Sequence, residues 1–158
     1  MRILGTTISA LALGAAIALA PVGAAMAGDG AAAITERQAL MKLIGASFGS
    51  IKADIDSKDA ARIKAAEGRA RAIANAANAI PTMFPKGSDS SAGKTAALEK
   101  AWSDAAGLKK AAEGMGMAAT KLADALKGGD AAAALAAFGA VGKDGCGGCH
   151  GTYRAKQN

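Results

Sequence analysis

The run Cys146-Gly147-Gly148-Cys149-His150 constrains this chain most, because it contains both cysteines and the only histidine of the 158 residues. A C-x-x-C-H run is the attachment site of c-type haem: two thiols add to the porphyrin vinyl groups and the adjacent imidazole ligates the iron. In a helix, Cys146, Cys149 and His150 would fall at i, i+3 and i+4, on one face. The run therefore predicts one haem c, attached through Cys146 and Cys149 and ligated by His150.

Three alternative roles for this run agree less well with the residues. A thioredoxin-like C-x-x-C needs a βαβ context, and the sequence contains no convincing strand. A structural zinc site needs four ligands, whereas two cysteines and one histidine supply three. A disulfide between residues three apart would leave His150 unexplained. Covalent haem is therefore the favoured interpretation.

Residues 1–27 have the pattern of a cleaved secretory signal peptide. Arg2 supplies a positive n-region, residues 8–19 form an apolar h-region, and Ala25-Met26-Ala27 is an A-x-A cleavage site. The apolar run is too short and too rich in small residues to be a strong membrane span, so we expect no stable membrane anchor. Because c-type haem is attached outside the bacterial cytoplasm, we expect a periplasmic protein whose haem domain is residues 28–158.

The charge of the mature chain gives little support to nucleic-acid binding. The whole chain carries a net charge of +6, and removal of Arg2 with the signal leaves +5. Aromatic residues are few and no long basic run occurs, which disfavours nucleic acid as a partner. A mildly basic rim could instead steer an acidic redox protein. At about 130 residues, the mature chain has the size of one compact domain.

Alanine dominates the mature chain and β-branched residues are sparse, which favours helix throughout. Four periodic segments are expected to be helices, at residues 31–55, from 57 or 59 to 80, 95–127, and from 131 through the haem motif. Pro81 and Gly128-Gly129 end two of them, and residues 81–94 form the long loop. The short links favour antiparallel neighbours. We therefore expect an all-α, antiparallel up-down-up-down four-helix bundle with haem attached to the C-terminal helix.

The first helix carries a charge within its apolar stripe, which consists of Ile34, Arg37, Met41, Ile44, Phe48, Ile51 and Ile55, widened by Leu40 and Leu43. A charge in such a stripe is costly unless it is paired. Arg37, with the neighbouring Gln38, could bind a haem propionate through charge-assisted hydrogen bonds. Alternatively, Arg37 could snorkel from the edge of the stripe into water.

Met41 follows Arg37 by one turn on the same face, which makes it the leading candidate for a sixth iron ligand. Methionine at helical spacing is also a common core residue, so the pattern leaves both roles open. Met83 is a weaker alternative ligand. The aromatic side chain of Phe84, in the loop, is expected to pack inward. Leu98 and Leu135 are expected to face the core from the third and fourth helices.

These residues together resemble the class II c-type cytochromes, the cytochrome c′ family. The resemblance rests on Arg37-Gln38-Ala39-Leu40-Met41-Lys42 with Gly45, Phe84-Pro85 with Gly87, Trp102, and the haem motif followed by Tyr153-Arg154. It covers essentially the whole mature chain. It implies thioether links at Cys146 and Cys149, His150 as the proximal ligand, Arg37 and Gln38 beside the propionates, Met41 in the distal position, and Arg154 near the proximal side. Phe84 belongs to the same candidate set.

Two functions are open within this family. The Leu-Met-Lys-x-x-Gly run at residues 40–45 looks more like the low-spin branch, so our first expectation is a periplasmic mono-haem one-electron carrier with His150/Met41 ligation, serving redox partner proteins as a monomer or homodimer. The alternative is a five-coordinate, high-spin protein that binds nitric oxide or carbon monoxide as a sensor or scavenger. An enzyme is not expected, because the only histidine is assigned and no distal acid or base is evident.

Overall fold

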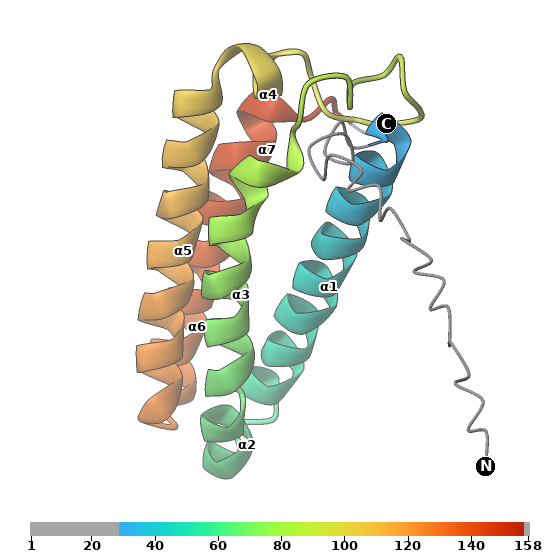
Figure 1. The fold of residues 1–158 in the computed structure, drawn as a ribbon. Coiled ribbons are helices and arrows are strands. Elements are labelled where there is room, and N and C mark those ends of the chain that lie inside the picture. The colour runs from blue at the N-terminus through green and yellow to red at the C-terminus, as the bar shows by residue number, and fades with distance from the viewer. Residues whose placement is uncertain (1–28, 157–158) are drawn as a thin grey trace, which may run out of the picture.

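The helices of this chain stand side by side in four columns (Figure 1). The structure, a computed structural model, describes residues 29–156, so the predicted signal peptide at 1–27 lies outside the described residues. The columns are α1 (Gly30–Asp56); α2 (Ala60–Ala65) and α3 (Glu67–Ala79) with the 3₁₀ turn η2 (Ile80–Met83); α4 (Lys100–Ser103) with α5 (Ala105–Lys127); and α6 (Ala131–Ala140), the π-helical η3 (Val141–Gly147) and α7 (Gly148–Tyr153). Successive columns run in opposite directions, and the predicted all-α four-helix bundle is confirmed. Among the helices described, none combines the length and apolar character that a bilayer crossing requires.

Aspartate caps begin three of the columns. The carboxylates of Asp29, Asp59 and Asp130 accept hydrogen bonds from the backbone N–H of Ala31 (3.0 Å), Ala61 (2.8 Å) and Ala133 (2.7 Å) respectively. Each cap satisfies a donor that has no partner within the helix, which is worth about 1 kcal/mol. The sequence-based starts of these helices are therefore confirmed to within a few residues.

The third column begins later than the predicted residue 95. Residues 95–98 are not helical, because their backbone pairs with the end of the chain: the Leu98 N–H donates to the Tyr153 carbonyl (2.9 Å) and the Ala155 N–H to the Ala96 carbonyl (2.8 Å). This pairing overrides the helical preference of the alanine-rich sequence. The helix then starts at Lys100 and is interrupted at Asp104, whose carboxylate caps α5.

Small side chains let α3 and α5 pack closely. Four alanines at their interface are fully or almost fully buried, Ala70, Ala77, Ala112 and Ala119. Larger apolar residues fill the rest of the core, among them Ile51, Ile63, Ile73, Leu122 and Leu126. Burial of each of these larger side chains stabilises the fold by roughly 1.5–3 kcal/mol.

Three leucines that were expected to face the core are exposed. Leu43 is 64% exposed, Leu98 40% and Leu135 47%, so their predicted burial was wrong. Leu98 lies in the non-helical segment before α4, and Leu135 is displaced outward because its neighbour Ala134 occupies the inward position on α6. Helical spacing alone does not decide which of two adjacent apolar residues faces inward.

Arg37 of α1 holds the segment 84–98 against the bundle. The residue is only 4% exposed, so it does not snorkel into water. Its two terminal nitrogens donate to the Ser88 hydroxyl (3.0 Å), the Ser88 carbonyl (2.6 Å), the Thr95 hydroxyl (3.0 Å) and, more weakly, the Met83 carbonyl (3.5 Å). Burial lowers the pKa of Arg37, and the charge of Asp89 opposes this shift. These bonds compensate the desolvation of the guanidinium.

Further contacts fix the same segment at other points. The rings of Phe84 and Trp102 lie 5.1 and 5.3 Å from the Arg37 guanidinium carbon, within cation–π range. The Trp102 indole N–H donates to the Pro85 carbonyl at 3.1 Å. A Cβ at Gly30 would overlap the Gly87 carbonyl oxygen, so α1 approaches the segment at a distance that only glycine permits. The segment is thus tied to α1 at one end and to the chain end at the other.

The first prediction concerns this guanidinium. Arg37→Ala leaves the buried Ser88 groups without donors and should lower the free energy of unfolding by roughly 2–4 kcal/mol. Arg37→Lys, which keeps the charge but not the fork of donors, should lose an intermediate amount. Urea unfolding of the holoprotein, followed by circular dichroism, measures both.

Arg62→Ala is the matched control, because Arg62 pairs with Asp54 at the surface and its side chain is 54% exposed. We expect it to cost less than about 1 kcal/mol. Equal losses for Arg37→Ala and Arg62→Ala would contradict the structural role of Arg37.

The second prediction concerns the pH dependence of stability. The Tyr153 hydroxyl donates to Asp104 Oδ2 at 2.9 Å. The pKa of Asp104 is lowered, first by this hydrogen bond, then by the Gly107 N–H and more weakly by Lys100, whereas burial raises the pKa of Tyr153. The contribution of Asp104 is therefore present above about pH 4 and is lost as pH falls through its lowered pKa. That of Tyr153 is present below about pH 10 and is lost as pH rises through its raised pKa.

Unfolding of the wild type and of Tyr153→Phe should be compared across this range. We expect the difference in unfolding free energy to be constant between about pH 5 and 9 and to shrink on both sides. A difference that does not change with pH would show that the carboxylate–hydroxyl pair contributes nothing.

Candidate functional site

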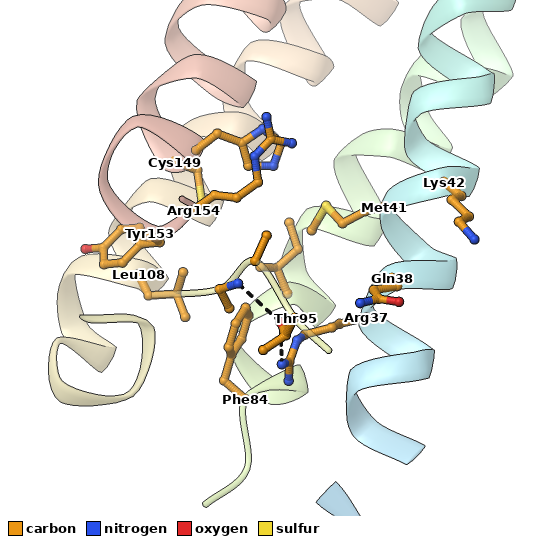
Figure 2. A pocket seen from close by; sticks show the side chains of 14 residues that line it. Arg37, Gln38, Met41, Lys42, Phe84, Thr95, Leu108, Cys149, Tyr153 and Arg154 are labelled. Atoms are coloured by element: carbon orange, nitrogen blue, oxygen red, sulfur yellow. Dashed lines mark hydrogen bonds between the residues drawn. The ribbon is translucent and has the colours of Figure 1, made fainter. Parts of the chain in front are cut away.

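A pocket of about 280 Å³ lies where α1, the segment 84–98, α5 and α7 meet (Figure 2). Seven of the eight predicted site residues line it: Arg37, Gln38, Met41, Phe84, Cys149, His150 and Arg154. The other lining residues were not among the predicted site residues: Lys42, Ile80, Thr95, Ala96, Ala97, Leu108 and Tyr153. Most of these missed residues come from the end of the 84–98 segment and from α5, which meet the site only because of the tertiary fold.

Cys146 is the predicted site residue that does not line the pocket. Its half-buried side chain packs against the main core, whereas Cys149 packs against a smaller cluster of Ala101, Leu108 and Tyr153. Cys146 lies in the last turn of π-helical η3. Since a π turn closes over i→i+5 rather than i→i+4, the expected one-face spacing of the motif does not continue through it.

The glycines near the motif explain how this π turn packs. A Cβ at Gly145 would lie 3.3 Å from the Met115 Cα, so η3 and α5 are in close contact at this point. The many glycines in this part of the sequence indicate that the backbone packs closely against a neighbour. At Gly145 that neighbour is α5.

Burial keeps the side chains of the haem motif uncharged, and for His150 this suits iron ligation. Burial raises the pKa of both thiols, and the pKa of Cys149 is raised further by Cys146. Burial, assisted by the charge of Arg154, lowers the pKa of His150. A neutral imidazole is therefore favoured at neutral pH, and its free lone pair can bind a metal.

Met41 lies on the wall opposite Cys149. Figure 2 shows its thioether pointing from α1 into the pocket, with Arg154 and Cys149 on the other side. Phe84 packs edge-to-face on Trp102, with ring centroids 5.4 Å apart, and presents an apolar surface to the same space. Gln38 lies at the rim, where its amide donates to the Lys94 carbonyl at 3.0 Å.

The residues fit a haem. Two thiols and a neutral imidazole lie within five positions of one helical segment, as covalent attachment and iron ligation need. Ile80, Phe84 and Leu108 give apolar walls for a porphyrin face, and the lining includes three cations for carboxylates, Arg37, Lys42 and Arg154, with no acidic residue among the described lining. In residues 29–156, no group of three His, Cys, Asp or Glu could hold a bare metal ion.

Comparison with known proteins assigns the family. Residues 32–154 match the family model described as cytochrome C′. Cytochrome c′ from Rubrivivax gelatinosus is 34% identical, with 80% of this chain and 98% of that chain covered and a TM-score of 0.67. A cytochrome c′ with ligand-controlled dimer dissociation is 32% identical, with coverage of 80% and 97% and a TM-score of 0.70. A nitric oxide complex of a cytochrome c′ variant from Alcaligenes xylosoxidans is 28% identical, with coverage of 82% and 98% and a TM-score of 0.68. No curated protein sequence matched.

These matches overturn our first functional expectation. The His150/Met41 electron carrier was wrong, because the chain matches cytochrome c′ proteins, one of them solved with nitric oxide bound, and nothing supports a low-spin His/Met branch. The physical reason is that a methionine one turn after Arg37 occupies the same position whether it coordinates a metal or only fills space. The spacing of residues 40–45 does not separate the two roles.

The predicted cofactor, one covalently attached haem c, is confirmed, and the chain has the two cysteines that such an attachment needs. The family model covers most of the chain, and two solved relatives exceed 30% identity over most of their length. The chain therefore belongs to the cytochrome c′ family.

Proposed function

We propose that this protein is a five-coordinate, high-spin haem protein that binds nitric oxide or carbon monoxide, as a sensor or scavenger. The observation that carries this proposal is the apolar part of the pocket lining, to which Met41, Ile80 and Phe84 contribute, with Met41 across the pocket from Cys149. The nitric oxide complex of the Alcaligenes xylosoxidans relative supports the choice of ligand. When bound, the haem would supply an iron that can take an imidazole nitrogen and a diatomic gas as ligands.

Residues of η3 and α7, with Arg154 directly after α7, would hold the proximal side. We propose that Cys146 and Cys149 form the thioether bonds and that His150 donates its lone pair to the iron. Burial keeps the imidazole neutral, and Arg154 strengthens that effect. Arg154 lies four residues after His150, so it is one helical turn away from the ligand in sequence.

Residues of α1 and η2, with Phe84 directly after η2, would form the distal side. Here Met41 would narrow the space beside a bound haem without ligating its iron, and Ile80 and Phe84 would keep that space apolar. A small uncharged gas can enter such a space. A charged ligand would lose its hydration there without a compensating hydrogen bond, and a larger ligand would not fit. The walls thereby select for diatomic gases by size and polarity.

The positively charged residues that line the pocket could pair with the haem carboxylates. We propose that Arg37 and Gln38 lie beside the propionates, as the family resemblance implies. The four hydrogen bonds of the Arg37 terminal nitrogens already go to Met83, Ser88 and Thr95. Arg37 would therefore act on a propionate mainly through its charge and its remaining Nε–H, and it would keep the 84–98 segment in place at the same time.

No bond-making chemistry on a substrate is proposed. General acid–base catalysis needs a group that can exchange a proton near the reacting atoms. The only histidine of the chain is assigned to the iron, and among the described lining residues no carboxylate is present. The expectation of redox protein partners stays a prediction. A relative with ligand-controlled dimer dissociation supports a homodimer.

The third prediction tests the role of Met41. Met41→Ala opens the distal space and should raise the rate of carbon monoxide association with the ferrous holoprotein about tenfold, a barrier decrease of about 1.4 kcal/mol. The ferric absorption spectrum should stay high-spin in both the wild type and the variant. Stopped-flow mixing measures the rate, and absorption spectroscopy the spin state.

Met117→Ala is the matched control, because Met117 is 64% exposed on α5 and does not line the pocket. It should change neither observable. A far-red methionine-to-iron band in the wild type that disappears in Met41→Ala would refute five-coordination and the proposed function with it.

The fourth prediction concerns processing and stoichiometry. We propose that the chain is exported and cleaved after Ala27, so that the mature protein is residues 28–158 in the periplasm. Intact mass spectrometry of the holoprotein from a periplasmic extract should give the mass of that chain plus one haem. A mass that retains residues 1–27, or recovery of the protein only in the cytoplasm, would contradict the signal peptide.

A further inference from the structure

α7, the helix that carries Cys149 and His150, is too short, and the segment before it too weakly helical, to fix its orientation. α7 is six residues long, and the seven residues of η3 before it are π-helical. η3 also contains Gly142, Gly145 and Gly147, which weaken a helix. So short a helix is not stable by itself. Its orientation must therefore come from contacts with other elements.

A hydrogen bond from Tyr153 provides such a contact. Tyr153 lies in α7, three residues after His150, and is 6% exposed. Its hydroxyl donates to Asp104 Oδ2 at 2.9 Å, while Asp104 Oδ1 accepts the Gly107 N–H at 2.9 Å and caps α5. The tyrosine is thus bonded to the first turn of a 23-residue helix, a far more rigid element than α7.

Gly107 makes this contact possible. A Cβ at position 107 would overlap the Tyr153 hydroxyl oxygen and both carboxylate oxygens of Asp104. A side chain at residue 107 would therefore force the hydroxyl or the carboxylate to shift from this geometry. The tyrosine also belongs to a small buried cluster with Ala101 and Leu108, against which Cys149 packs.

The backbone at the end of α7 is fixed as well. The Tyr153 carbonyl accepts the Leu98 N–H at 2.9 Å, and Arg154 is already extended, with φ −124° and ψ 136°. Side chain and backbone of Tyr153 therefore hold the C-terminal end of the helix from two directions. His150 lies three residues before Tyr153 in α7, so a change in the orientation of this helical turn would also change the orientation of the imidazole.

We propose that Asp104, Tyr153 and Gly107 form a latch that positions the His150 imidazole toward the haem iron. Asp104 and Tyr153 are positioning residues in this proposal, since they act through His150. The proposal rests on the proposed proximal role of His150. It adds that the angle of the imidazole is set by the N-terminus of α5 and only weakly by the helix in which His150 lies.

The test uses the ferrous holoprotein without gas. Tyr153→Phe removes the hydroxyl and keeps the buried ring. Resonance Raman spectroscopy should show a shifted and broadened iron–imidazole stretching band, because the imidazole can then adopt a range of angles. Thr152→Val is the matched control, because its hydroxyl lies on the same helix and bonds only to the Gly148 carbonyl at 3.5 Å. That variant should leave the band at its wild-type position and width.

Gly107→Ala provides a second, independent way to break the latch. It retains both Tyr153 and Asp104 but displaces the hydroxyl by overlap, so it should reproduce the band of Tyr153→Phe. The double variant Tyr153→Phe/Gly107→Ala should show the same band as either single variant, because all three lose the hydrogen bond between Tyr153 and Asp104. An unchanged band in Tyr153→Phe, accompanied by reduced stability in urea, would overturn the proposal and leave a packing role alone.

Because no gas is added, the outcome is separate from that of the proposed function. A protein that fails to bind carbon monoxide but shows the shifted band would refute the gas-binding proposal and keep the latch. A wild-type ferrous protein with no iron–imidazole band would refute the latch together with the proximal role of His150.

Discussion

The buried guanidinium of Arg37 determines how the rest of the site is assembled. A charge with 4% exposure is tolerated only because its donors are used, and their acceptors lie in the turn at Met83 and in the segment 84–98. Bonding to them places Phe84, Thr95 and the residues after Thr95 beside α1. The same segment then pairs with the chain end next to α7. One buried cation thereby connects the two helices that face each other across the pocket.

The link between α1 and the chain end through the segment 84–98 explains why a pocket is present in a bundle whose alanine-rich helices otherwise pack closely. Where α3 meets α5, small side chains let the helices approach closely. At the end of the bundle that holds η2 and α7, the segment 84–98 contacts both α1 and the chain end after α7, and larger residues such as Phe84 and Leu108 line the space that remains. A flat apolar macrocycle with an anionic edge matches that space and its cationic rim. The distribution of small and large residues therefore determines both where the helices pack closely and where space for the cofactor remains.

Sequence periodicity predicted much of this arrangement and was wrong at identifiable points. It predicted four helices, the approximate starts of three of them and the buried isoleucines of α1, because those features depend on residues close in sequence. It missed the late start of α4, where residues 96 and 98 pair with the chain end, and the π turn that places Cys146 against the main core. It also misplaced Leu43, Leu98 and Leu135, whose exposure depends on neighbouring elements.

The sequence by itself determined the cofactor, since two thiols and the only imidazole stand in one five-residue run whose chemistry is local. It also singled out Arg37, Gln38, Met41, Phe84 and Arg154 as candidates, and all of them line one pocket. Only the tertiary structure decided what Arg37 bonds to and which residues of α5 and the 84–98 segment complete the walls. Those contacts join residues about 50 positions apart, such as Arg37 with Ser88 and Asp104 with Tyr153. Contacts over such separations depend on how the helices pack, which local spacing does not encode.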